Sequence, residues 1–571
     1  MRDLYHVLVD YDAVMLRAIA ELWGVSLTAR QGREMAAELA KHLCQPGVVE
    51  RAWGDSLCRA GLEALVAAGG RLPAPQFDRR FGEVRPFGPG RLERERPWTA
   101  PANVAEALWY RGLIGRAFEP GPAGPQAFVF IPSDVLALLA QGRRATASPW
   151  RTPPLGVKAA EPAAFTPAPT TLVDDLCTLL AYLQTTQVAA DKQEGLAERH
   201  RQALARHLLD ATGAAEGRGR FAFLWGLGLA AGLVVAAGRQ WKPEPERARA
   251  WLSAGREAQL AALAAAWRDA PHWNDLWHVP SLRPEDTGWR NDPVLARRAI
   301  LRLLAELSPG SASEGERPVW WDLAAFIAGV KAHEPDFQRP TGDYTSWYLR
   351  DAASGEYLKG FESWEAVEGA LIAFLLQGPL HWLGLVDVAP GAFRFTPRGL
   401  RFLRGEAPGP DEEKTARLSV RADGTIDVPR NADRYQRFQT ARIAAWVAAG
   451  ETYRYRFTPA SLARADKQGI RVEQVLSFLG RASGGRLPGA LVQALRRWAQ
   501  AGTQVRLRDM VVLQVTSAQV LEALRASPAV RPYLGEALGP LAVAVRRADW
   551  PRLEQAIRQI GYLPEVEGLE E

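Results

Sequence analysis

The sequence predicts a mainly α-helical chain with small β-hairpins, an α+β class, divided into several modules. Three segments, 112–139, 232–252 and 384–403, share one pattern: an apolar helix ends at Gly-Leu followed by Ile or Val, and a short apolar strand follows. The length of 571 residues exceeds what one hydrophobic core holds. Apolar residues make up 47% and charged residues 23%, which is typical of an ordered globular chain. We therefore expect several folded domains in series.

The first and third of these segments predict a helix, a β-hairpin and a second helix in succession. In both, a loop rich in Gly and Pro leads to an alternating strand, with Phe128 and Phe130 in one and Phe393 and Phe395 in the other. A Pro that suits the first turn of a helix follows. This order, after two earlier helices, is typical of a winged helix, in which the hairpin is the wing. We interpret the chain as tandem winged-helix-like modules followed by a C-terminal α+β domain.

The pattern of expected elements divides the chain into six parts. These are an N-terminal helical pair at 1–50, a winged helix at 51–140, a Pro-rich linker at 141–170, a helical, winged-helix-like domain at 171–310, a winged helix at 311–405 and an α+β domain at 411–565. The N-terminal pair breaks at Trp23-Gly24-Val25, with Asp12 and Thr28 as expected N-caps. Two alternatives stay open for this pair: a small helix-turn-helix element, or a cap on the next domain.

Nothing in the sequence predicts export or membrane insertion. Asp3, Asp10 and Asp12 interrupt the N-terminus where a signal peptide requires an apolar run. The uncharged stretch 221–238 contains glycines and part of a repeated segment, so a buried helix followed by a strand explains it better than a membrane span. The three cysteines form no CxxC pair and no disulfide framework. We expect a cytoplasmic protein with no membrane partner.

The basic residues are mostly arginine. Basic residues exceed acidic residues by six, and only eight of the 70 basic residues are lysine. The planar guanidinium of arginine holds phosphate oxygens in pairs, which favours a phosphate-bearing partner. An Arg-rich and Ala-rich composition also follows from a GC-rich genome, so the net charge alone selects no partner. Residues 411–564 hold 24 basic and 14 acidic residues, a difference of ten, and are the most basic part of the chain.

Nine arginines are candidate DNA-binding residues. One pair lies in a basic loop of the first winged helix, where nearby glutamates are alternative partners. Three lie on the third wing strand and on the helix after it. Another pair shares one face of the YRYRF strand, opposite its tyrosines, and the last pair lies near the end of a helix, where cations complement the dipole. For each group, solvated surface is the alternative. The nine are Arg79, Arg80, Arg394, Arg398, Arg401, Arg454, Arg456, Arg496 and Arg497.

The sequence contains no recognisable motif for catalysis, a cofactor or a metal. It lacks GxxxxGK[ST], HExxH and GxSxG, and its Gly-rich run at 226–232 lies inside an apolar helix instead of after a strand. Residues 271–290 gather three tryptophans and two histidines, which we interpret as packing because the histidines do not have the spacing of a helical metal pair. Asp174 and Asp175 fit the first turn of a helix. We expect no cofactor, no metal and no enzymatic activity.

The C-terminal block has a different order of elements. Asp423-Gly424 predicts a hairpin within SVRADGTIDVP, a helix is expected over 434–450, and YRYRF at 453–457 predicts a strand. Thr458 and Pro459 then open a helix as N-cap and first residue. The remaining expected elements are strands in VRLRDMVVLQV and LAVAV and helices at 517–526, 530–537 and 549–559.

This block resembles the N-terminal domain of XPB-type DNA repair and transcription helicases, as it occurs in bacterial helicase-associated proteins. The resemblance rests on SVRADGTIDVP, on YRYRFTPASLARADKQGIRVEQVLSFLGRASGGRLPGALVQALRRWA and on the strand pair that follows. These give a hairpin, a Thr-Pro helix, a Leu-x-x-Leu helix and a Leu-Pro-x-x-Leu helix. In XPB-type helicases the domain precedes the motor, and those proteins act on duplex DNA. The resemblance implies a DNA-associated accessory role.

We therefore predict a non-catalytic DNA-associated accessory protein in DNA repair, with arginine contacts to phosphates. Its expected partners are duplex or forked DNA, bound with weak sequence preference, and an XPB-type helicase supplied by another chain. Two alternatives stay open: a winged-helix protein–protein scaffold without DNA binding, and an unrecognised nuclease with dispersed carboxylates.

Overall fold

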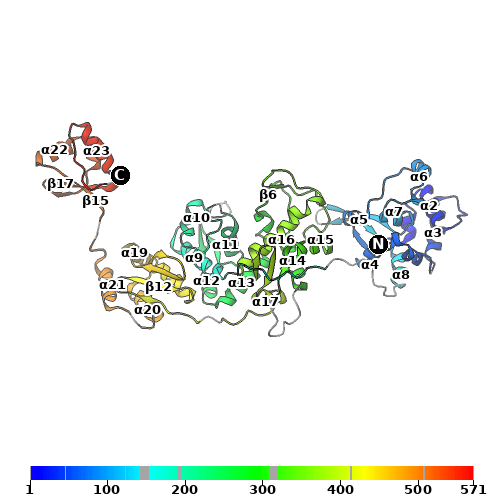
Figure 1. Ribbon diagram of the computed structural model, residues 1–571, viewed down its shortest axis with the longest axis horizontal. Helices are drawn as coiled ribbons and strands as arrows, with labels where there is room; N and C mark the ends of the chain where they lie inside the picture. The colour runs from blue at the N-terminus through cyan, green and yellow to red at the C-terminus, as the bar shows by residue number, and fades with distance from the viewer. Residues whose placement is uncertain are drawn as a thin grey trace. The chain divides into compact units, whose positions relative to one another are not determined.

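The computed structural model confirms the predicted fold class: helices dominate, and the strands form small sheets (Figure 1). The chain divides into two compact units. The larger comprises Met1–Ser419, Thr425–Arg456 and Ala482–Gly484, and the smaller comprises Val420–Gly424, Phe457–Arg481 and Gly485–Glu571. The structure describes residues 2–45, 47–121, 124–141, 154–190, 195–215, 217–307, 319–411, 414–485, 487–505 and 508–569.

Residues 2–141 form a helical body around one small sheet of order β1-β3-β2. The fully buried Leu16 and Leu39 belong to the same hydrophobic core as Leu62, Leu108 and Val129. The N-terminal helical pair therefore shares the core of the helices that follow, which fits its interpretation as a cap. The elements are α1 (Leu4–Leu8), α2 (Ala13–Trp23), α3 (Gly32–Leu43), α4 (Ser56–Ala67), β1 (Arg71–Pro73), α5 (Ala74–Phe81), α6 (Pro89–Glu95), α7 (Val104–Tyr110), β2 (Gly115–Gly121), β3 (Gly124–Phe130) and α8 (Ser133–Gln141).

The two predicted N-caps at the N-terminus have different outcomes. Asp12 caps α2 by accepting a hydrogen bond from the Met15 N–H at 2.8 Å, and α2 ends at Gly24 with a φ of 68°. The prediction for Thr28 is wrong, because α3 begins at Gly32. The backbone N–H of Thr28 instead donates to the Glu38 carboxylate at 3.0 Å, which holds the loop against the helix.

Residues 171–307 are mainly helical, with one short hairpin. The uncharged stretch 221–238 forms most of α11 and the strand β4, as predicted, and Phe223 and Leu227 of α11 are buried. No helix in the described ranges is long and apolar enough to cross a membrane. The elements are α9 (Thr171–Thr185), α10 (Glu198–Ala205), α11 (Gly219–Ala230), β4 (Val234–Ala237), β5 (Gln240–Pro243), α12 (Pro245–Leu252), α13 (Arg256–Asp269), β6 (Leu282–Pro284) and α14 (Pro293–Leu307).

Residues 319–404 place a hairpin between two helical segments. The segment before the hairpin contains two π-helical turns, Glu365–Gly369 and Leu376–Leu380, and the second includes Pro379, which cannot donate a helical hydrogen bond. The hairpin joins β7 in a sheet of order β7-β10-β9. The elements are β7 (Trp321–Asp322), α15 (Leu323–His333), β8 (Leu349–Asp351), α16 (Ala370–Leu375), β9 (Val386–Ala389), β10 (Ala392–Phe395) and α17 (Pro397–Arg404).

The predicted Pro-rich linker is only partly described, since residues 142–153 lie outside the described ranges. Residues 154–170 differ from a linker without contacts, because they run along the β7-β10-β9 sheet. The Ala159 N–H donates to the Trp320 carbonyl at 2.8 Å, and the Thr166 N–H donates to the Val388 carbonyl at 2.8 Å. Backbone groups near both edge strands of the sheet are thus satisfied by a segment without regular secondary structure.

The C-terminal block contains two further sheets, β11-β12-β14-β13 and β15-β17-β16. In the smaller unit, Leu524 of α22 and Leu553 of α23 pack with Val545 of β17 in one core. The elements are β11 (Ser419–Val420), β12 (Thr425–Pro429), α18 (Arg434–Ile443), β13 (Ala445–Ala448), β14 (Thr452–Arg456), α19 (Pro459–Lys467), α20 (Val472–Ala482), α21 (Gly489–Ala501), β15 (Met510–Gln514), α22 (Ala518–Ala526), β16 (Ala537–Gly539), β17 (Ala542–Arg546) and α23 (Trp550–Gln559).

Two helices predicted in this block are shorter than expected. The helix expected over 434–450 ends at Ile443, and the next residues form β13, where Trp446 packs edge-on against Tyr455 with ring centroids 6.1 Å apart. Cross-strand packing therefore overrides the helical propensity of this alanine-rich stretch. The helix expected at 530–537 is only a 3-10 turn, Arg531–Tyr533. The predicted N-cap Thr458 is confirmed, because it forms a capping box with Ser461.

Candidate nucleic-acid interface

Strand β14 carries two of the candidate arginines on its exposed face. Arg454 and Arg456 are exposed, whereas Tyr453 and Tyr455 between them are buried, which confirms the predicted division of the strand. Arg454 donates from Nε to Asp427 Oδ1 on the neighbouring strand β12 at 2.8 Å, yet its side chain remains 44% exposed. Asp427 itself is buried, so only the arginine end of this pair reaches solvent. The guanidinium groups on this face are therefore accessible to a solvent-borne anion.

The opposite face of β14 lies over a buried ionic network. The guanidinium of Arg437 lies 3.8 Å from the Tyr453 ring centroid and donates to the backbone carbonyl of Asp174. The carboxylate of Asp174 accepts hydrogen bonds from Arg256 and Arg430, each at 2.8 Å. Burial raises the pKa of Asp174, but Arg256 and Arg437 lower it by more, so this pKa lies below the ordinary value. The network fixes α18 and the end of β12 on helix α9.

Asp174 lies in the first turn of α9, as the sequence predicts. The sequence does not indicate which arginines pair with it. Arg430 and Arg437 are more than 250 residues away along the chain. Arg256 is 82 residues away. Sequence spacing carries no signal for pairs at such separations. This network serves structure, because Asp174 and the arginines around it bond to one another inside the protein.

Helix α21 carries the second C-terminal pair of candidate arginines. Leu491 and Leu495 are buried, whereas Arg496 and Arg497 are exposed. Arg496 donates to the exposed Glu473 at 2.9 Å. The predicted contribution of this pair to the helix dipole is wrong, because α21 continues to Ala501 and its last turn contains no basic residue.

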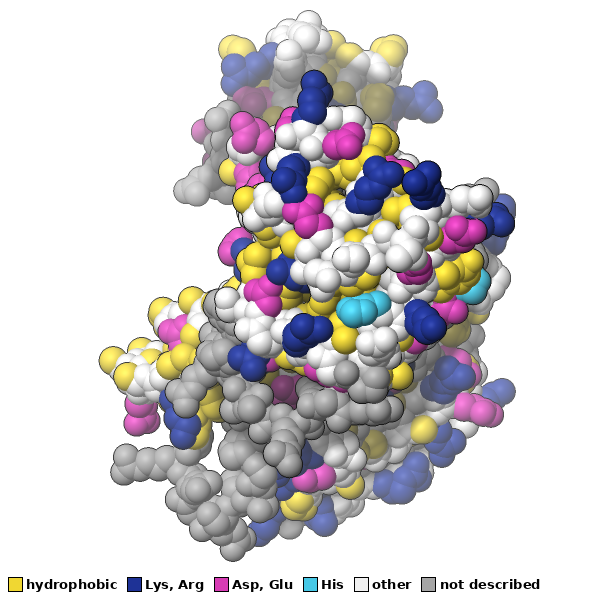
Figure 2. Space-filling model, turned by 90° about the vertical axis from the view of Figure 1, so that its right-hand side faces the viewer, with side chains coloured by type: hydrophobic (Ala, Val, Ile, Leu, Met, Phe, Trp, Pro, Cys, Tyr) yellow, Lys and Arg dark blue, Asp and Glu magenta, His cyan; other side chains and the backbone are white. Residues whose placement is uncertain are grey.

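The candidate arginines of the first module divide into one internal and one exposed residue. Both oxygens of Asp336 accept hydrogen bonds from Arg79, at 2.6 and 2.7 Å, and the Arg79 side chain is 19% exposed. The guanidinium also lies 4.3 Å from the centroid of the Phe361 ring. Arg79 is thus committed within the protein, while Arg80 is exposed. The face of the molecule in Figure 2 shows basic and acidic side chains intermixed, without one basic patch.

The candidate arginines of the third module are mostly used inside the protein. Arg394 pairs with Asp387 at 2.7 Å and lies 4.4 Å from the Phe165 ring centroid, so this arginine of the predicted wing packs against a residue of the predicted linker. Arg398 pairs with Glu257 of α13, with Nε donating at 2.9 Å. Arg401 is half-buried. These arginines therefore form no exposed basic face beside the wing, which corrects the prediction of one.

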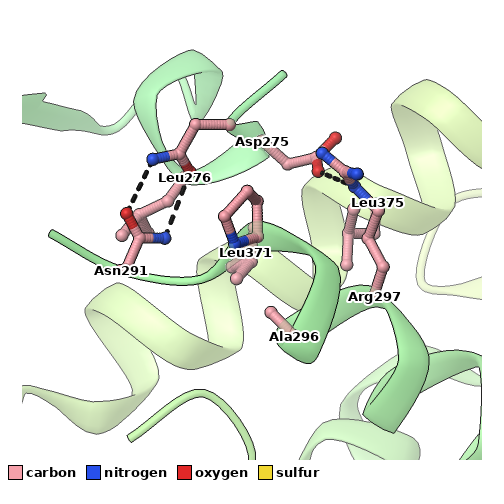
Figure 3. A pocket seen from close by; sticks show the side chains of 9 residues that line it. Asp275, Leu276, Asn291, Ala296, Arg297, Leu371 and Leu375 are labelled. Atoms are coloured by element: carbon pink, nitrogen blue, oxygen red, sulfur yellow. Dashed lines mark hydrogen bonds and ion pairs between the residues drawn. The ribbon is translucent and has the colours of Figure 1, made fainter. Parts of the chain in front are cut away.

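One small pocket lies between Asp275, Arg297, Leu371 and Leu375 (Figure 3). It has no room for a water molecule, and its polar lining is satisfied internally. Asp275 accepts from Arg297 Nε at 2.5 Å. Asn274 and Asn291, which also line it, exchange hydrogen bonds at 2.6 and 3.1 Å. Among the residues that the structure describes, no group of three or more side chains is arranged to hold a metal ion.

The tryptophan–histidine cluster at 271–290 packs only in part as predicted, because Trp277 and His272 are exposed. Trp273 is buried, and the His278 ring stacks on it with centroids 3.9 Å apart and an interplanar angle of 7°. Trp273 Nε1 donates to Asp275 Oδ1 at 2.8 Å. Burial lowers the pKa of His278 to about 4, so this ring is neutral at physiological pH.

Residues 418–539 match a family model described as the helicase conserved C-terminal domain. The match includes β14 and α21, which carry four of the candidate arginines, and falls within the block that resembles the XPB-type domain. It supports a helicase-related role for this part of the chain. The family description names a helicase C-terminal domain, so the finer resemblance to an XPB-type N-terminal domain stays a prediction. A comparison with curated proteins finds no match.

Proposed function

We propose that this protein is a non-catalytic, DNA-associated accessory factor that works with a helicase supplied by another chain. The observation that carries the proposal is the exposed arginine pair on β14, inside the segment that matches a helicase family. Arginine at this position suits phosphate oxygens, which it holds with two parallel N–H donors. Arg496 and Arg497 on α21 are a second exposed pair within the same matched segment.

The topology of the matched segment favours an accessory role over a motor. The registered ladders β12–β14, β13–β14, β15–β17 and β16–β17 are all antiparallel. Nucleotide-binding α/β folds instead use parallel strands joined by crossover helices, with a glycine-rich loop between strand and helix. The sequence has no GxxxxGK[ST] to form such a loop. The protein is therefore expected to hydrolyse no ATP by itself.

The expected mode of DNA binding is contact with the phosphate backbone. Arg454 and Arg456 are two residues apart on one strand and project from the same face, so they can follow a phosphate row without entering a groove. Such contacts position a protein on DNA but do not discriminate between sequences. Binding should weaken as salt rises, because each phosphate contact releases condensed counterions.

The test is a DNA-binding experiment with purified protein. Fluorescence anisotropy measures its affinity for labelled duplex and forked DNA at several salt concentrations. The account predicts similar affinities for unrelated sequences and a log–log salt slope of about −0.9 for each phosphate contact. An ATPase assay with and without DNA should give no turnover. Salt-independent binding, or DNA-stimulated ATP hydrolysis by clean protein, would contradict the proposal.

A protein–protein scaffold is the second candidate function. The internal pairing of Arg79, Arg394 and Arg398 favours it, because the winged-helix-like regions then offer few arginines to DNA. A protein that captures a helicase but binds neither duplex nor forked DNA at low salt would support this alternative.

A further inference from the structure

A small ribbon outside the matched segment presents an aromatic and basic face. β6 pairs with β8 so that Arg283 lies opposite Arg350. An isolated bridge then places Tyr357 opposite Arg350 on the other side. Residues directly opposite one another in a sheet project from the same face. Tyr348, two residues before Arg350, projects from that face as well. The ribbon thus gathers two tyrosines and two arginines on one surface.

The inner face of this ribbon is rigidly supported. Leu349 is fully buried, and the Trp347 ring stacks on Trp289 with centroids 5.3 Å apart and an interplanar angle of 21°. Arg339, paired with the buried Glu368, covers Trp347 with its guanidinium 3.8 Å from the ring centroid. The outer side chains are therefore held on a packed base.

The outer face leaves two aromatic rings open to solvent. Tyr348 is 42% exposed and Tyr357 is 41% exposed. The Tyr357 hydroxyl donates to Glu285 at 2.9 Å, and Arg350 pairs with the same carboxylate at 2.5 Å. The hydrogen bond to Glu285 holds the Tyr357 ring in place. The ion pair with Arg350 neutralises the charge of the Glu285 carboxylate.

Cations flank both rings. Lys359 Nζ lies 5.0 Å from the Tyr357 ring centroid and 5.9 Å from the Tyr348 ring centroid. Arg283 is exposed and lies opposite Arg350 in the strand pair. The face therefore combines two partly exposed rings with the cations Lys359 and Arg283. The Arg350 guanidinium covers one side of the Tyr357 ring, 3.7 Å from its centroid, and the charge of Arg283 also acts on Glu285. This combination is complementary to a polyanion with planar groups.

The geometry points to a binding site for single-stranded nucleic acid, in which unpaired bases stack on Tyr348 and Tyr357 and Lys359 and Arg283 contact the flanking phosphates. Aromatic rings on a sheet face stack bases of any sequence, whereas bases within a duplex are covered by their neighbours. The site is separate from the arginine face of β14, so either site can fail without the other. It would let the protein hold the unpaired strand that a helicase produces.

The test compares two double variants by fluorescence anisotropy with a labelled mixed-sequence single strand. Tyr348→Ala/Tyr357→Ala removes both rings, and we expect about tenfold weaker binding or more, because each stacked base contributes substantially. Tyr348→Phe/Tyr357→Phe keeps both rings and should bind close to the wild type. Inorganic polyphosphate, a polyanion without bases, should bind both variants equally. Thermal unfolding checks that each variant is folded.

Three results would overturn the proposal: wild-type protein that binds no single strand, an Ala variant that binds it normally, or an equal loss of affinity for polyphosphate. If the Ala variant does not fold, Lys359→Gln tests the same site without changing a ring. The Lys359→Gln variant should bind the single strand more weakly and with a smaller salt dependence. Unchanged binding would contradict the proposal that Lys359 contacts a phosphate. Duplex binding lost only in Arg454→Ala/Arg456→Ala would show that the two sites act separately.

Discussion

Arginines lie on both sides of strand β14, but in opposite environments. On one face, Arg437 is 3% exposed, covers the Tyr453 ring and belongs to the network around Asp174. On the other face, Arg454 is 44% exposed and pairs with Asp427. Arg437 is bound by protein groups instead of water, whereas the guanidinium of Arg454 remains partly hydrated. A phosphate can therefore reach Arg454 from solvent, whereas contact with Arg437 would require opening the packed interior.

Arginine content alone therefore does not predict a DNA interface. Arg394 and Arg398 lie near a hairpin and looked equivalent to Arg454 in the sequence, yet both are paired with carboxylates in half-buried positions. A cation that already has a desolvated partner gains little from a phosphate. What separates the groups is the element that packs against each arginine.

Removal of the central carboxylate of the buried network should have the largest effect on stability. Asp174→Asn removes the counter-charge of the buried Arg256 and Arg437, so we expect a loss of about 3–5 kcal/mol in the free energy of unfolding. Urea denaturation measures this change. A loss below about 1 kcal/mol would mean that the buried ion pairs around Asp174 contribute no more to stability than exposed ion pairs do.

Acid should destabilise the protein through another group, the half-buried His278. In the unfolded chain this imidazole takes up a proton near pH 6.5, whereas in the folded protein its pKa is about 4. The unfolded state therefore binds more protons between these values, and stability falls as the pH drops from about 6.5 to about 4, by up to about 3 kcal/mol.

The matched control for this prediction is His278→Phe, which keeps a ring on Trp273 but cannot be protonated. Its free energy of unfolding should depend less on pH over the same range. An identical pH dependence in the two proteins would show that His278 is not responsible.

The smallest effect is expected at an exposed pair. Arg496 and Glu473 are 57% and 68% exposed, so Glu473→Gln should change the free energy of unfolding by less than about 1 kcal/mol. Urea denaturation of Glu473→Gln, measured together with Asp174→Asn, gives the contribution of a solvated ion pair to the free energy of unfolding. A comparable loss in the two variants would remove the distinction between buried and exposed charges.

Much of the fold follows from local signals in the sequence. The period-two pattern of YRYRF predicted which side chains of β14 are exposed, and Asp12 and Thr458 marked true helix starts. Predictions failed where tertiary contacts decide. Thr28 bonds to Glu38 rather than capping α3, and Trp446 packs into a hairpin that ends the preceding helix.

The candidate site was predicted only in part, for the same reason. Exposure of Arg454 and Arg456 follows from strand alternation, a local property. The burial of Arg394 and Arg398 depends on Phe165 and Glu257, which are distant in the chain and give no local signal. The tyrosine face at Tyr348 and Tyr357 also depends on pairing between separated segments.

The most direct test of the central claim is the salt dependence of duplex DNA binding by Arg454→Ala/Arg456→Ala. The control is Arg298→Ala/Arg302→Ala, which removes two arginines of α14 that are 67% and 53% exposed and lie outside the matched segment. The account predicts weaker binding at low salt and a log–log slope reduced by about 0.9 for each lost contact in the β14 variant, with little change in the control. Equal affinities and slopes in the β14 variant and the wild type would contradict it.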